Sequence, residues 1–257
     1  ERASLLASAV DAAPEVSVRV VDTILSLTAE QLMAIGGDNF TAEGSGGFVI
    51  TGLSAEQGLD LDALPETANV TLLLAGSAGA ALVAAAEFAV TEAATATRTV
   101  LLELTGAVDL RLADLANVDA IRLLDGAVVT LTPAQAGALD IAGAGDLTID
   151  LAGADTTLSL DADADGSSAG GANQTLDLAA INITFINSAE ATATATLALT
   201  GDDDVVLKGI DTGPGVATFE IENALADGAK LDITGGTPAL TLDPSTTTLR
   251  LRSTGGN

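Results

Sequence analysis

The sequence predicts an all-β protein, a parallel β-solenoid or β-helix-like repeat array with short helical turns at its corners. Short runs with an apolar residue at every second position recur along the whole chain, which is the pattern of half-buried strands. Gly, Asp, Asn and Pro separate these runs, as expected of turns. The apolar residues are almost all Ala, Leu, Val and Ile, and aromatics make up only 2%. The core must therefore be thin and closely packed, as it is in a solenoid.

The strands begin in many cases about 10 or about 20 residues apart, which suits the rungs of a solenoid. Each strand is three to five residues long. In chain order the predicted strands are 16–20, 70–74, 100–104, 108–112, 128–131, 147–151, 158–160, 176–178, 181–185, 197–199, 205–207, 217–221, 230–233, 240–242 and 248–252.

Tandem β-sandwich domains are the alternative, because sandwich strands have a similar spacing. Two observations favour this alternative. The spacing between the starts of successive strands is irregular, and the run from Ile121 to Leu131 with Asp125-Gly126 at its centre predicts a β-hairpin. We expect residues 1–257 to form one repetitive β-rich segment, with weak divisions near residues 92–99 or 161–175, where the composition becomes simpler. The start at Glu1 and the Gly-rich end suggest a processed chain or a piece of a longer one.

Three similar stretches predict single helical turns that cap strands. They place Thr28, Ser54 and Thr132 just before small residues and a Gln, at the N-cap position that Ser and Thr favour. Pro133 then occupies the first helical position, where its missing N–H costs nothing.

The charge and the missing residue types exclude several functions. Nine Lys and Arg stand against 36 Asp and Glu, which gives a net charge of −27 and argues against binding to nucleic acid. The chain has no His and no Cys, so a Ser-His-Asp triad, an imidazole or thiolate metal site and disulfides are excluded. The acidity suggests adaptation to a saline or calcium-containing exterior, where cations relieve charge repulsion.

One apolar stretch, Leu72–Val90, resembles a membrane helix in its hydropathy alone. It is mostly Ala and Gly and contains Glu87, and a carboxylate is costly in lipid. We therefore expect no membrane span.

Two acidic segments are the candidate calcium sites. Asp161, Asp163 and Asp165 alternate and are followed by Gly166, an arrangement in which calcium loops place oxygen ligands around one ion. Asp177 is a candidate to complete this loop. The second segment, with Asp202, Asp203 and Asp204, comes directly before a predicted strand. The alternative for both segments is a plain solvated acidic loop.

Further Gly- and Asp-containing turns, Gly143–Asp146 and Gly153–Asp155, resemble single degenerate copies of the RTX nonapeptide. Together with the Ala/Thr/Gly/Asp-rich composition, they make the chain similar to the large repetitive surface proteins of Gram-negative bacteria, the S-layer proteins and RTX-type adhesins. The resemblance implies export to the cell surface, calcium binding and assembly into a lattice, a filament or an adhesive stalk.

The sequence thus predicts an extracellular structural protein of the bacterial cell surface, and not an enzyme. The alternative is a polysaccharide-binding or polysaccharide-cleaving β-helix protein, such as a lyase or a phage or surface glycosidase, which would use pairs of carboxylates. Expected partners are further copies of the chain, joined through open repeat edges, and cell-surface polysaccharide. The arginines expected to form ion pairs between copies are Arg19, Arg98, Arg111, Arg122, Arg250 and Arg252.

Overall fold

The computed structural model describes residues 2–4, 17–35, 39–53, 58–76, 88–162, 168–169, 181–189, 192–201, 205–206, 208–225, 231–232, 240–242, 244, 246 and 248–253. The backbone forms two compact units, Glu1–Arg122 and Leu123–Asn257, and each unit is described by itself. Residues 92–99 lie within the first unit and residues 161–175 within the second. The divisions expected at these two places stay predictions.

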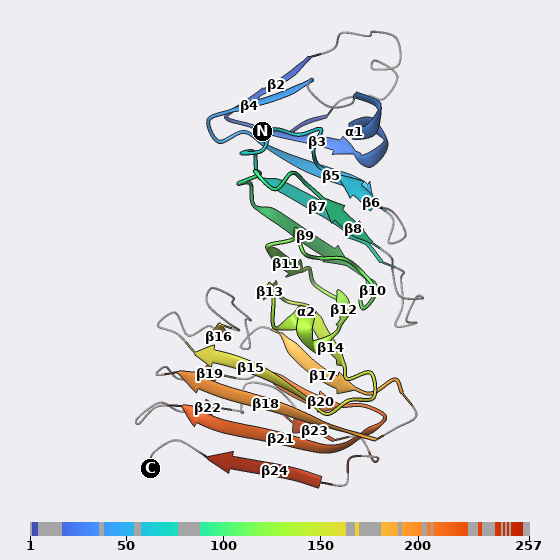
Figure 1. Ribbon diagram of the computed structural model, residues 1–257, viewed down its shortest axis with the longest axis vertical. Coiled ribbons are helices and arrows are strands. Elements are labelled where there is room, and N and C mark those ends of the chain that lie inside the picture. Colours follow the sequence, from blue (N-terminus) through green and yellow to red (C-terminus); the bar gives the residue numbers. More distant parts are fainter. Residues whose placement is uncertain are drawn as a thin grey trace. The chain divides into compact units, whose positions relative to one another are not determined.

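The first unit is built on a sheet of parallel strands that follow one another in chain order (Figure 1). Phe48 pairs with Val70, and Val70 in turn pairs with Val100. The strands of this sheet are β1 (Arg2–Ser4), β3 (Ile24–Thr28), β5 (Gly47–Leu53), β7 (Val70–Ala75), β9 (Val100–Thr105) and, at the unit boundary, β11 (Ala120–Leu123). The other elements are the parallel pairs β2 (Val18–Val21) with β4 (Phe40–Glu43) and β6 (Gly58–Asp60) with β8 (Ala89–Thr91), the strand β10 (Ala107–Asp109) and the helix α1 (Ala29–Ile35).

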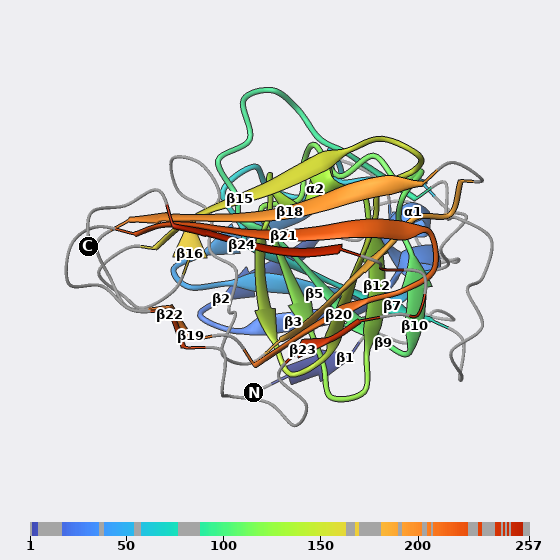
Figure 2. The ribbon, with the colours of Figure 1, turned by 90° about the horizontal axis from the view of Figure 1, so that it is seen from below.

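The second unit contains two layers of parallel strands, which are seen from below in Figure 2. One layer holds β12 (Val128–Leu131), β14 (Asp146–Asp150), β17 (Asn182–Ile186), β20 (Gly209–Thr212) and β23 (Leu240–Thr241). The other holds β15 (Thr156–Ala162), β18 (Ala193–Gly201), β21 (Val216–Leu225) and β24 (Thr248–Ser253), with β16 (Ser168–Ala169) antiparallel to β15. The remaining elements are the parallel pair β19 (Val205–Val206) and β22 (Leu231–Asp232), the strand β13 (Asp140–Gly143) and the helix α2 (Pro133–Ala136).

The alternating pattern of the sequence becomes a buried row and an outward row on each strand. In β9 the side chains of Val100, Leu102 and Leu104 are fully buried, whereas Glu103 between them is half-buried. Because paired residues of parallel strands point to the same face of a sheet, these buried residues continue the buried row of β7. The all-β class expected from the sequence is confirmed, with parallel pairing in both units.

The few phenylalanines lie inside the units, where they are the largest core side chains. In the first unit the rings of Phe40 and Phe48 meet edge to face, with centroids 5.6 Å apart. In the second unit Phe185 from β17 meets Phe219 from β21, with centroids 5.5 Å apart. Phe185 and Phe219 thus join the two layers of the second unit, and both are fully buried.

The helical turns expected after Thr28 and Thr132 are confirmed. The Thr132 hydroxyl accepts a hydrogen bond from the backbone N–H of Gln135, while the Gln135 side chain accepts one from the Thr132 N–H. Thr28 and Gln31 make the same reciprocal pair at the start of α1. This capping box satisfies two N–H groups that the first turn leaves without partners. Ser54, the third expected cap, lies outside the described residues.

The expected hairpin from Ile121 to Leu131 is wrong. A turn does form at Asp125-Gly126, with Gly126 at a positive φ and the Ala127 N–H bonded to the Leu124 carbonyl. However, β12 pairs in parallel with β14, and β11 belongs to another sheet. The turn is therefore a corner between sheets. The sandwich alternative also fits poorly, because sandwich strands pair antiparallel and the described pairs of the long sheets are parallel.

No helix among the described residues is long and apolar enough to cross a membrane. Part of the apolar stretch Leu72–Val90 forms the end of β7 and most of β8, and residues 77–87 lie outside the described part of the chain.

Candidate functional site

The two candidate calcium segments leave the same sheet at neighbouring positions. Asp161 lies in β15 and pairs with Thr200 of β18, and the next residue, Ala162, pairs with Gly201. Residues 163–165 follow the end of β15, and residues 202–204 follow the end of β18. The carboxyl ends of β15, β18 and β21 lie side by side in Figure 1. The register therefore brings the starting points of both acidic segments to one edge of the sheet.

The carboxylates themselves lie beyond what the structure describes. Only the backbone of Asp161 is placed, as part of β15. The other expected ligands lie outside the described residues; they are Asp163, Asp165, Asp177, Asp202, Asp203 and Asp204. Within the described residues, no group of three or more acidic side chains is arranged to hold a metal ion.

Several of the described aspartates form corner turns. Asp60, Asp109, Asp114 and Asp150 each accept a hydrogen bond from the backbone N–H two residues further on, which is the Asx turn. Each is followed by a buried Leu, whose carbonyl accepts from the N–H three residues later. The Asp-Leu pair is thus a repeated corner motif, in which the carboxylate holds the turn and the leucine fills the core.

We did not recognise this corner motif from the sequence, although its signal is present there. The four Asp-Leu pairs are each followed, three residues after the Leu, by Leu64, Ala113, Val118 or Ala154. The same spacing occurs at Asp177-Leu178, which is followed by Ile181.

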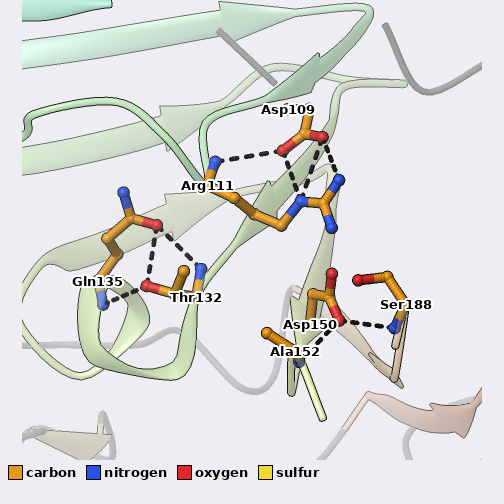
Figure 3. A network of polar contacts seen from close by, with 7 residues as sticks. All are labelled: Asp109, Arg111, Thr132, Gln135, Asp150, Ala152 and Ser188. Atoms are coloured by element: carbon orange, nitrogen blue, oxygen red, sulfur yellow. Dashed lines mark hydrogen bonds and ion pairs between the residues drawn. The ribbon is translucent and has the colours of Figure 1, made fainter. Parts of the chain in front are cut away.

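One corner carries a buried ion pair. The Arg111 guanidinium donates to both carboxylate oxygens of Asp109, with Nε–Oδ1 at 3.0 Å and Nη2–Oδ2 at 2.7 Å (Figure 3). The Asp109 side chain is 1% exposed and that of Arg111 is 25% exposed. This bidentate geometry is the strong form of such pairs. It ends β10 at Asp109, so the strand expected over 108–112 stops early, and Leu112 lies 66% exposed at the corner.

A second buried carboxylate ties two rungs of the second unit together. Asp150 is fully buried, and its Oδ1 accepts hydrogen bonds from the N–H groups of Ala152, at 3.0 Å, and Ser188, at 2.9 Å (Figure 3). The neighbouring Asn187 accepts from the Gly153 N–H at 2.7 Å and donates to the Gly215 carbonyl at 3.3 Å. Side-chain oxygens and amides thus provide hydrogen-bond partners for backbone N–H and C=O groups at successive corners.

Arg98 is the most deeply buried cation among the described residues. Its side chain is 0% exposed, its Nη1 donates to the Leu61 carbonyl at 3.1 Å, and its Nε lies 3.1 Å from a Glu92 carboxylate oxygen. Burial lowers the pKa of the Arg98 guanidinium, and the charges of Glu92, Asp62 and Glu66 oppose this shift. Arg98 therefore braces the loop after β6 against the loop after β8.

The remaining arginine pairs are found within the chain. Arg19 pairs with Glu43, and this hydrogen bond lowers the pKa of the exposed Glu43 carboxylate. Arg122 lies 3.0 Å from Glu103, and Arg250 lies 3.7 Å from Glu220. Each of the five arginines whose side chains are described has a carboxylate partner in its own chain; they are Arg19, Arg98, Arg111, Arg122 and Arg250. The expected pairing of arginines between copies stays a prediction.

Comparison with known proteins does not assign the chain to a family. No family model, no curated protein and no solved structure matches the chain.

Proposed function

We propose that this chain is a structural protein of a Gram-negative bacterial cell surface, a β-solenoid segment that assembles with further copies and has no enzymatic activity. The proposal is supported by the parallel, in-register pairing of strands that are separated by long and variable stretches of chain. Val128 pairs with Asp146, for example, whereas Thr156 pairs with Ala195. Such pairing is typical of a chain that coils and stacks one rung on the next.

Calcium between neighbouring rungs is the second part of the proposal. The single observation that carries it is the register of β15 and β18, because Ala162 pairs with Gly201 and both acidic segments start at that edge. An ion held by residues from two rungs neutralises their mutual repulsion, and hard cations of this size favour carboxylate oxygens. In a chain with a net charge of −27, this repulsion is a substantial cost of folding.

Thermal melting with calcium and with EDTA tests the metal. If calcium binds the folded state alone, a concentration one hundred times its Kd raises the Tm by about 5–10 °C for a chain of this size. Magnesium at equal ionic strength is the control for simple screening. We expect D202N/D203N to lose most of the shift. The matched variant E30Q/D125N removes two exposed carboxylates elsewhere and should keep it.

A Tm that is the same in calcium and in EDTA removes calcium from the proposal. Equal shifts in the two variants reduce the effect to general screening. Assembly is followed separately, by negative-stain microscopy at rising protein and calcium concentrations, where we expect lattices or filaments. Uniform monomers that release reducing sugars from acidic polysaccharides would instead support the polysaccharide-cleaving alternative.

A further inference from the structure

The corner at the start of the second unit has a fixed base and a free tip. The carbonyls of Leu123 and Ala127 each accept a hydrogen bond from an N–H group of the next rung, at 2.9 and 2.8 Å. Both residues are buried, whereas Asp125 and Gly126 between them are exposed to solvent. Two further Asp-Gly pairs lie outside the described residues; they are Asp165-Gly166 and Asp227-Gly228.

The turn at this tip leaves the carboxylate and the next backbone nitrogen without partners. The Ala127 N–H donates to the Leu124 carbonyl at 2.9 Å, and Gly126 has a φ of 75°, as in a type II turn. In the described part of the chain, neither the Asp125 carboxylate nor the Gly126 N–H has a hydrogen-bond partner. Outside the adjacent residues, no atom lies within 4 Å of the position that a Cβ on Gly126 would take. The Gly126 nitrogen is therefore free to approach the Asp125 carboxyl carbon without breaking a hydrogen bond.

Other corner aspartates are protected from the same approach. The carboxylates of Asp60 and Asp150 each accept a hydrogen bond from the N–H two residues further on. The N–H groups directly after them, those of Leu61 and Leu151, donate to carbonyls of neighbouring rungs at 2.9 Å. Both leucine side chains are buried beside these nitrogens, whereas glycine has no side chain to obstruct the approach. The contacts at the Asp125 corner therefore set it apart from these corners.

We propose that Asp125 is a site of spontaneous isomerisation, through attack of the Gly126 nitrogen on the Asp125 side-chain carboxyl group. A bond forms between this nitrogen and Cγ and closes a succinimide ring, while the carboxyl O–H leaves with the amide proton as one water. Water then opens the ring at the main-chain carbonyl of Asp125. The peptide bond to Gly126 now runs through Cγ, and an α-carboxylate remains. Nothing is oxidised or reduced, and neighbouring groups of one chain react without a second partner besides water.

The product, isoaspartate, lengthens the turn by one backbone atom. The buried residues Leu123 and Ala127 keep their hydrogen bonds to the next rung, so the added atom is accommodated at the tip. We expect the rungs to stay folded and the modified fraction to grow with time. This inference is independent of the proposed function, because it needs only the corner.

Digestion with endoproteinase Asp-N tests the site, because this protease cleaves before aspartate and not before isoaspartate. The folded 257-residue chain is kept at neutral pH for several weeks, then unfolded and digested. We expect a progressive loss of cleavage before Asp125 at unchanged mass, with a minor species that is lighter by one water. Cleavage before Asp60 and Asp150 in the same samples should stay complete. Complete cleavage before Asp125 at every time point would overturn the proposal.

A matched variant separates the effect of the corner from that of the dipeptide. A120G places a glycine directly after Asp119, whose carboxylate accepts a hydrogen bond from the Val100 N–H at 2.7 Å. We expect cleavage before Asp119 to persist in the folded variant while cleavage before Asp125 falls. Equal losses at the two positions would mean that the dipeptide alone decides the reaction, and would overturn the role of the corner.

A second variant replaces A120G if circular dichroism shows that A120G melts early. T156G places a glycine after Asp155, whose carboxylate accepts from the Thr194 N–H at 2.7 Å. The same outcomes apply there, with persistent cleavage before Asp155 expected and a loss equal to that at Asp125 contradicting the proposal.

Discussion

Replacement of Phe185 by alanine is expected to lower the free energy of unfolding by about 3–5 kcal/mol, the usual cost of removing a buried phenylalanine. Phe185 is fully buried and lies against Phe219 across the two layers of the second unit. The chain has no Trp and no Tyr, and only five Phe. The remaining core side chains are mostly aliphatic, so the cavity is filled only by rearrangement of the layers. Urea unfolding, followed by circular dichroism, measures the loss.

The contact between the two rings can be separated from simple burial. Phe185→Leu keeps most of the apolar volume and should cost less than the alanine variant. A double-mutant cycle of Phe185→Leu with Phe219→Leu should give a coupling of about 0.5–1.5 kcal/mol, as expected for neighbouring aromatic rings. A loss below about 1 kcal/mol for the alanine variant would mean that Phe185 does not join the layers. Removing a fully buried phenyl ring leaves a cavity whose free-energy cost is larger than that.

Replacement of Asp150 by alanine is expected to cost about 2–5 kcal/mol, because two backbone N–H groups then lose a charged acceptor that is itself fully buried. These groups belong to Ala152 and Ser188, which lie on successive rungs. The same urea titration measures the effect. Asp150→Asn keeps a carbonyl oxygen in place of the accepting carboxylate oxygen and should cost less.

Asp114→Ala is the matched control for this prediction. Asp114 forms the same turn, with its Oδ1 accepting from the Ala116 N–H, but its side chain is exposed to solvent. Water replaces the lost acceptor there, and the cost should stay near about 0.5–1 kcal/mol. Equal losses at Asp114 and Asp150 would contradict the role of buried corner carboxylates in holding rungs together.

Many of the strands were predictable because their signal is local, although β3 and β5 were not among the predicted runs. An alternating run such as Val70–Leu74 needs only one buried face to become a strand, and β7 begins at the same residue and buries every second side chain. The capped turns after Thr28 and Thr132 were predictable for a similar reason, since a Thr and a Gln three residues later satisfy each other's backbone. Neither pattern requires knowledge of a distant partner.

The pairing of strands was harder to predict because it depends on distant residues. The run around Asp125-Gly126 has a hairpin turn in its sequence, but β12 finds its partner in β14. Turn chemistry alone does not decide whether the next strand folds back or passes to another sheet. The corner aspartates were missed for a related reason. A carboxylate such as Asp150 is read from sequence as a ligand or a solvated charge, and only the fold shows the two N–H groups that it accepts.

The parallel coiling of the chain is tested most directly by measuring the register between neighbouring rungs. The chain has no Cys, so paired cysteines can be introduced without interference. Ser159 and Ala198 are register partners on β15 and β18, and adjacent strands lie about 4.8 Å apart, within the range that a disulfide spans. We expect S159C/A198C to form an intramolecular disulfide on oxidation. S159C/T200C, two residues out of register, should remain reduced. Crosslinking of the second pair alone, or of neither, would contradict a chain that coils into parallel rungs.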